Sequence, residues 1–126
     1  MLLLPDTFIL LWWLTDDSRL SSRAGALLAE RGNRTFVSSV SLWEIAIKSQ
    51  LGRLTADVDE VRVTALDGGF EPLPFTLEHA GAVAQLPLRH RDPFDRALIA
   101  QALIGPLALL THDQSLSVYG KCVLHE

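Results

Sequence analysis

The stretch "RDPFDRALIAQALIGPLALLTHD" (Arg91–Asp113) contains a predicted helix, a break and a predicted strand in immediate succession. Asp92 is a favourable N-cap residue, and the proline after it suits the first position of a helix. The predicted helix, Pro93–Leu103, is apolar nearly all round, which indicates burial between two layers. Gly105–Pro106 ends it, and the apolar run Leu107–Thr111 then predicts a buried strand.

The same alternation of strand and helix extends over the rest of the chain. Expected strands are Met1–Pro5, Thr35–Ser39, Phe70–Pro74 (a strand or an extended link), Leu107–Thr111 and Lys121–Leu124. Expected helices are Thr7–Leu14, Ser21–Arg31, Ser41–Leu51, Asp57–Leu66, Thr76–Leu86 and Pro93–Leu103. Alternation of this kind predicts an α/β fold with a central parallel sheet flanked by helices on both faces.

Length and composition indicate one ordinary globular domain spanning residues 1–126. Hydrophobic residues make up 48% of the chain and charged residues 21%, and the net charge of −4 argues against a general basic coat for nucleic acid. The single Cys122 excludes an intrachain disulfide and fits a reducing compartment. Asp6 interrupts the apolar N-terminus, which has no basic leader, so we expect a soluble cytoplasmic protein with no membrane segment.

Four acidic residues follow the predicted strands or begin the helices next to them: Asp6, Glu44, Asp95 and Asp113. In a parallel sheet the carboxyl ends of the strands share one edge, so we expect the four carboxylates to meet in one crevice. Like charges at close range repel, and a divalent cation relieves that repulsion. Ligands that are all oxygen suit Mg²⁺, with Mn²⁺ as a substitute.

Helix capping offers a simpler explanation for each acid taken singly. Asp6 and Asp113 are suited to capping a helix and a turn, and Asp95 suits the first turn of its own helix. Ser41 and Glu44 have the spacing of a capping box. If capping accounts for all four, the chain is a non-enzymatic binding module.

Several motifs together resemble the PIN-domain ribonucleases, specifically the VapC-like toxins of toxin–antitoxin pairs. They are "LLLPDTFILLWWL", "VSSVSLWEIAIKSQLGRL", "FEPLPFTLEHA", "LPLRHRDPFDRALIAQAL" and "LLTHDQSLSVYG". The resemblance implies a three-layer α/β/α fold whose acidic quartet (Asp6, Glu44, Asp95, Asp113) holds Mg²⁺ and cleaves RNA phosphodiesters with metal-activated water. It also implies an antitoxin partner and a homodimer. Pro5 and Phe8 depart from the family pattern, which usually has an apolar strand residue and a histidine there.

The resemblance and the sequence suggest further site residues. Asp92 and Thr111 are expected to contact and orient the four acids without binding the metal themselves. Lys48, Arg91 and Arg96 are the candidate contacts to RNA phosphates, although Lys48 is also spaced to pair with Glu44 on one helix.

Other residues carry weaker signals. His90 and His112 are weaker candidates, as loop histidines are commonly solvated. The tryptophans (Trp12, Trp13 and Trp43) are expected in the core or at an interface. The alternatives to a toxin are a PIN nuclease that processes RNA without an antitoxin and the binding module described above.

Overall fold

The computed structural model describes residues 1–126 and contains one five-stranded sheet in the order β3-β2-β1-β4-β5. Each neighbouring pair of strands is parallel, and Leu3 of β1 pairs with Thr35 on one side and with Ala108 on the other. The strands are β1 (Leu2–Pro5), β2 (Arg34–Ser38), β3 (Glu71–Leu73), β4 (Ala108–Thr111) and β5 (Val123–His125). The predicted parallel α/β fold is confirmed.

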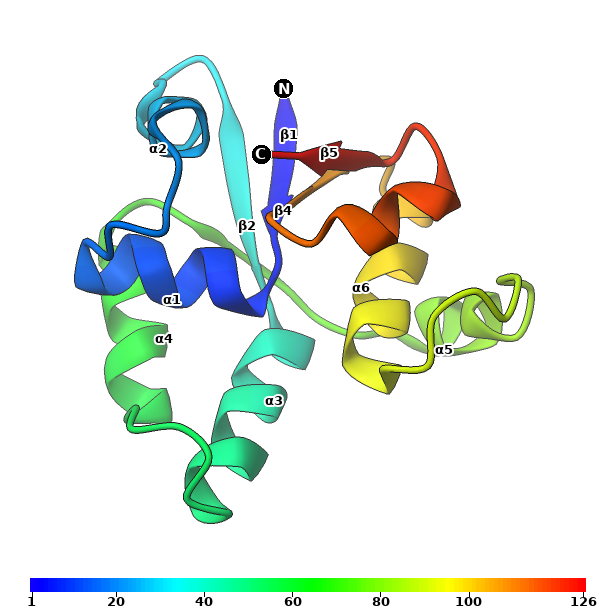
Figure 1. The fold of residues 1–126 in the computed structure, drawn as a ribbon, viewed down its shortest axis with the longest axis horizontal. Helices are drawn as coiled ribbons and strands as arrows, with labels where there is room; N and C mark the ends of the chain where they lie inside the picture. The colour runs from blue at the N-terminus through cyan, green and yellow to red at the C-terminus, as the bar shows by residue number, and fades with distance from the viewer.

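Helices cover both faces of this sheet, which gives three layers (Figure 1). The ribbon places α1, α2 and α4 on one side of the strands and α5 and α6 on the other, while α3 lies beyond the end of β2 (Figure 1). The helices are α1 (Thr7–Thr15), α2 (Ser22–Ala29), α3 (Ser39–Gln50), α4 (Val58–Asp67), α5 (Leu77–Val83) and α6 (Pro93–Ile104), followed by the 3₁₀ helix η1 (Gln114–Tyr119).

Adjacent strand residues pack into different hydrophobic clusters, as expected for a sheet that is buried on both sides. In β4, Leu109 packs with the α6 residues, whereas Leu110 packs with Ile9 of α1 and Ala24 of α2. Every α6 residue from 96 to 102 is buried. The prediction of a helix enclosed between layers is therefore confirmed for α6.

Some predicted boundaries are wrong. Helix α3 begins at Ser39, two residues before the expected start, because the Ser38 hydroxyl caps it by accepting from the Val40 amide at 3.0 Å. Helix α5 ends at Val83, three residues early. The last strand begins at Val123, two residues after the expected start at Lys121, because η1 continues to Tyr119 and a turn follows it.

The chain reverses its direction of travel across the sheet at β1. From β1 it passes through β2 to β3, and then returns to place β4 on the opposite side of β1. In open parallel sheets, sites form at this switch point, outside the carboxyl ends of the strands. Pro5 does not disturb the switch point, because it pairs with Leu110 and the Asp6 amide donates to the Leu110 carbonyl at 2.9 Å.

None of the helices is long and apolar enough to cross a lipid bilayer.

Candidate active site

Asp6 lies between β1 and α1, and only 5% of it is exposed. Its Oδ1 accepts from the Ile9 amide at 2.9 Å and so caps α1. Its Oδ2 accepts from the Thr111 hydroxyl at 2.6 Å, which links the exits of β1 and β4. The capping role predicted for Asp6 is correct, and Thr111 lies directly behind this carboxylate.

Glu44 is 3% exposed and lies in the second turn of α3. The Thr7 hydroxyl donates to its Oε1 at 2.6 Å, and Lys48 forms an ion pair with its Oε2 from one turn further along the helix. The predicted capping box of Ser41 and Glu44 is wrong, because α3 begins at Ser39 and its cap is Ser38. The carboxylate of Glu44 therefore faces the exit of β1 and caps no helix.

Asp95 lies in the first turn of α6, as predicted. Its Oδ2 is 2.9 Å from His90 Nε2, and about one fifth of each side chain is exposed. The neighbouring Asp92 caps the helix by accepting from the amides of Phe94 (2.8 Å) and Asp95 (3.3 Å). Asp92 therefore supports the backbone that carries Asp95.

Asp113 follows β4 and is exposed. Its Oδ1 accepts from the amide of Ser115 at 2.9 Å and from the hydroxyl of the same residue at 2.7 Å, so it caps η1. Its own amide donates to the Thr111 hydroxyl oxygen at 3.0 Å. The ligand atoms of His90, Asp95 and Asp113 all lie within 4.8 Å of one another.

The four acids lie close enough together for the charge of one to shift the pKa of another. Burial raises the pKa of Asp6 to about 6, and the charges of Glu44 and Asp113 contribute to this rise. Burial also raises the pKa of Asp95 to about 6, with further contributions from Asp92, Asp6 and Glu44. The Ser115 hydrogen bonds lower the pKa of Asp113, helped by the charge of His90.

The donor set fits a hard divalent cation. Asp6 and Glu44 together present buried carboxylate oxygens, and each oxygen makes only one contact to this chain. Asp95 and Asp113 add oxygens that are open to solvent on one side. A cation at this edge would offset the mutual repulsion of the carboxylates, which contributes to the raised pKa values of Asp6 and Asp95.

The three predicted RNA contacts fall in different environments. Arg91 is exposed on the loop before α6, and the Lys48 ammonium sits at the acids, 5.6 Å from the Phe8 ring centroid. Arg96 is 9% exposed and donates to the carbonyls of Pro87 (2.9 Å) and Val83 (3.2 Å). The guanidinium of Arg96 is therefore used inside the protein, whereas Arg91 is exposed.

Sequence reasoning underestimated two kinds of residue at this site. Thr7 bonds Glu44 and also Ser41 (3.1 Å), and its position directly after Asp6 in the first motif was the available signal. His90 was expected to be solvated, yet it contacts Asp95. Nothing in its local sequence predicts that contact, since the loop path decides it.

The tryptophans divide between core and surface. Trp13 stacks on Phe70 with ring centroids 4.5 Å apart, within the α1–α4 layer. Trp43 is 58% exposed and meets Phe94 edge-on at 5.0 Å. Trp12 is half-buried: it packs against the cluster of Ile9, Ala24 and Leu110, and the Arg19 guanidinium is 5.1 Å from its ring centroid.

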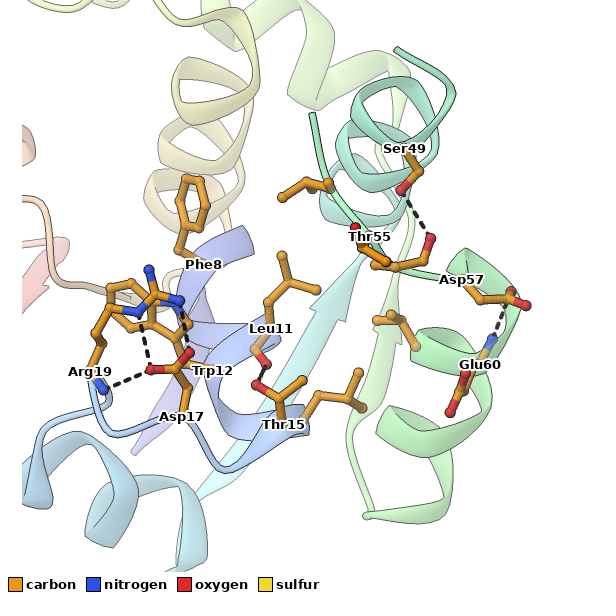
Figure 2. A pocket seen from close by; sticks show the side chains of 14 residues that line it. Phe8, Leu11, Trp12, Thr15, Asp17, Arg19, Ser49, Thr55, Asp57 and Glu60 are labelled. Carbon is orange, nitrogen blue, oxygen red and sulfur yellow. Dashed lines mark hydrogen bonds and ion pairs between the residues drawn. The ribbon is translucent and has the colours of Figure 1, made fainter. Parts of the chain in front are cut away.

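A groove of about 920 Å³ lies beside the acids, between α1 and the segment that joins α3 to α4 (Figure 2). Phe8, Leu11 and Trp12 line it from α1, and Asp57 and Glu60 face them from the start of α4 (Figure 2). Phe8 also contacts Lys48, the partner of Glu44, so one residue of the groove wall adjoins the acidic cluster.

Comparison with solved structures finds the same fold in toxin–antitoxin complexes. The chain is similar to a chain of VapBC2 from Rickettsia felis bound to a promoter DNA fragment (TM-score 0.71, 12% identity, 100% of this chain and 98% of that one). It is also similar to a chain of a toxin–antitoxin complex from Klebsiella pneumoniae, with a TM-score of 0.66 and 20% identity over 96% of this chain and 94% of that one. A chain of FitAcB from Neisseria gonorrhoeae matches with a TM-score of 0.65 and 20% identity over 99% of this chain and 97% of that one.

No curated protein sequence matches the chain. The family model of the PIN domain matches residues 3–121, from β1 to the turn before β5. This match includes all four acids and the two strands between which they converge. The chain therefore belongs to the PIN domain family.

Proposed function

We propose that this protein is a metal-dependent endoribonuclease and the toxin of a toxin–antitoxin pair, acting in the cytoplasm. PIN domains are nucleases, and the solved complexes with the same fold are toxin–antitoxin assemblies. Asp6, Glu44, Asp95 and Asp113 would hold Mg²⁺, or Mn²⁺ in its place. When bound, such a cation activates water and offsets charge on the phosphate.

The burial of Glu44 is the observation that carries this proposal. Moving an ionised carboxylate out of water costs several kcal/mol unless it is well compensated. Its partners are Thr7 and Lys48, and it caps no helix, so capping does not explain its position. A carboxylate kept at such a cost beside Asp6 is typical of a ligand or a catalytic group.

Different residues at this edge of the sheet would orient the acids, contact RNA and accept a proton. Thr7 and Thr111 orient Glu44 and Asp6 by donating one hydroxyl to each. Asp92 fixes the first turn of α6 and with it Asp95. Lys48 and the exposed Arg91 would contact RNA phosphates on either side of the acids. One of the four carboxylates would accept the proton of the attacking water.

We assign the antitoxin to the groove beside α1 (Figure 2). Its wall of Phe8, Leu11 and Trp12 suits apolar side chains of a peptide, and the charges of Asp57 and Glu60 at its rim suit basic ones. Because Phe8 in this wall contacts Lys48, the partner of Glu44, a segment bound in the groove could extend over the acids and block RNA.

A second copy of the chain is assigned to the apolar patch around Trp43. This patch lines a hollow of about 500 Å³ and contains no charged residue: Ser39, Val40, Trp43, Phe75, Ala80, Val83, Pro93 and Ala97. An uncharged surface lets two copies, each with a net charge of −4, meet without like-charge repulsion.

The test is cleavage of RNA by the purified protein, freed of any partner, with Mg²⁺, Mn²⁺ or EDTA. Glu44→Gln keeps the side-chain shape and removes the charge, and we expect it to abolish cleavage and to weaken metal binding in calorimetry. Glu78→Gln is the matched control, because Glu78 is exposed in the first turn of α5. Folded protein that neither binds metal nor cleaves RNA would overturn the proposal.

A further inference from the structure

His90 lies among the acids and not in solvent. Its Nε2 atom is 2.9 Å from Asp95 Oδ2, and a ligand atom of Asp113 lies within 4.8 Å of both residues. The charge of His90 also lowers the pKa of Asp113, so two carboxylates face this imidazole. About one fifth of the His90 side chain is exposed, which leaves the group open to solvent on one side only.

The loop that carries His90 is anchored immediately before it. Arg96 donates to the Pro87 carbonyl at 2.9 Å, and the Tyr119 hydroxyl donates to the same carbonyl at 3.1 Å. A second nitrogen of Arg96 donates to the Val83 carbonyl at 3.2 Å, at the end of α5. A buried guanidinium and a tyrosine thus fix the chain three residues from His90, so the position of the imidazole is built into the fold.

The spacing of His90 and Asp95 matches two neighbouring ligands of one metal ion. Metal–oxygen and metal–nitrogen bonds in protein sites are about 2.0–2.2 Å long. Two such ligands at right angles are therefore roughly 3 Å apart. The contact between His90 and Asp95 has this length, and Asp113 lies close enough to add a third ligand.

We propose that His90 supplies a nitrogen ligand to the divalent cation at this edge, together with Asp95 and Asp113; this inference rests on the proposed function. An imidazole in the ligand set favours transition metals over Mg²⁺, because Mg²⁺ prefers oxygen. The proposed ligand set predicts that the site binds Mn²⁺ in preference to Mg²⁺, a preference that four carboxylates alone would not give. Arg96, which holds the loop, is a positioning residue for this ligand.

Pulsed electron paramagnetic resonance of the Mn²⁺-loaded full-length protein tests the inference directly. We expect a ¹⁴N coupling from one directly bound imidazole, which changes to the ¹⁵N pattern when the histidines are labelled. His90→Gln should remove the coupling and weaken Mn²⁺ binding by about tenfold or more in calorimetry, with a smaller effect on Mg²⁺. His112→Gln is the control, since His112 also lies at this edge but contacts Trp12 and the C-terminal carbonyl.

The outcomes separate the two proposals. Mn²⁺ that binds without nitrogen coupling in the wild-type protein overturns the assignment of His90 and leaves the carboxylate site intact. Folded protein that binds no Mn²⁺ overturns the proposed function as well. The isotope experiment on the wild-type protein decides the question even if His90→Gln does not fold.

Discussion

Glu44 is the residue at which the capping explanation of the acids fails. Asp6, Asp92 and Asp113 each cap a helix, as their sequence positions suggest. Glu44 does not, although it is among the most buried polar residues of the chain. A residue can cap a helix and serve a site at once, so the capping bonds of the aspartates do not argue against metal binding.

The raised pKa of Asp6 predicts how the stability of the metal-free protein depends on pH. This carboxyl titrates near 3.8 when unfolded and near 6 when folded, so the unfolded state ionises first. Its contribution to the free energy of unfolding is complete below about pH 4 and is lost as the pH rises to about 6. Two pKa units correspond to about 3 kcal/mol.

Urea unfolding in EDTA from pH 4 to pH 8 measures this loss. Asp6→Asn keeps an acceptor for the Ile9 amide and cannot ionise, so it should gain stability relative to the wild type as the pH rises. Asp59→Asn, at an exposed acid of α4, is the control and should follow the wild type. If the free energies of unfolding of the wild type and of Asp6→Asn changed equally with pH, the prediction would be contradicted.

At the scale of the element, α6 does two tasks. Its apolar residues fill the space between the sheet and α5, and its first turn carries Asp95. Arg96 lies where the buried part of the helix meets this first turn. Its guanidinium points back along the helix to the carbonyls of Pro87 and Val83 in the segment before it. A charged residue in the buried part of α6 thus holds the loop that precedes the helix.

Replacement of Arg96 should therefore destabilise the protein. Arg96→Met keeps the length of the side chain and removes the guanidinium hydrogen bonds to the Pro87 and Val83 carbonyls. We expect a loss of about 2–3 kcal/mol in the free energy of unfolding, measured in urea. Arg91→Met, in the same motif but exposed, should change it by less than about 0.5 kcal/mol. Equal losses in the two variants would show that Arg96 does not hold the loop.

Gly52 ends α3 in the left-handed region, with φ +73°, and has open space around the position of a Cβ. Gly52→Ala should cost about 1–2 kcal/mol, because the backbone conformation alone is unfavourable for alanine. Gly81 also has open space but lies within α5 without a positive φ. Gly81→Ala should instead stabilise by about 0.5–1 kcal/mol in the same urea experiment. Changes of the same sign would contradict the argument from φ.

At the scale of the whole molecule, strand order decides the position of the site. With β1 central and β4 beside it, Asp6 and Asp113 follow neighbouring strands, and α3 brings Glu44 to the same edge. The Trp43 patch lies next to this edge, because Trp43 precedes Glu44 and contacts Phe94, which precedes Asp95. Association through the patch would therefore bring two acidic sites close together.

Trp43→Arg should convert the proposed dimer to a monomer in analytical ultracentrifugation. The change puts a like charge on both sides of an uncharged interface, and we expect dimerisation to weaken by tenfold or more. Val118→Arg is the matched control, because Val118 is equally exposed and does not line the hollow. A wild-type protein that sediments as a monomer at micromolar concentration would contradict the dimer proposal.

The sequence by itself determined the layers of the fold and the residues of the acidic cluster. Apolar runs separated by amphipathic or buried helices leave few arrangements other than a parallel sheet. Caps such as Asp92, followed by proline, mark helix starts because their effect is local. The spacing of Asp6, Glu44, Asp95 and Asp113 relative to the strands then placed them at one edge, and the structure brings them there.

Only the tertiary structure decided the start of α3, the burial of Arg96 and the contact of His90 with Asp95. Several serines near the start of α3 could cap it, and in the structure the cap is Ser38, which is also the last residue of β2 and pairs with Leu73 of β3. Arg96 and His90 depend on how the loop after α5 packs against Tyr119, far away in the sequence. The path of this loop is set by packing against a segment about 30 residues away along the chain, so local sequence patterns do not predict which groups the loop brings together.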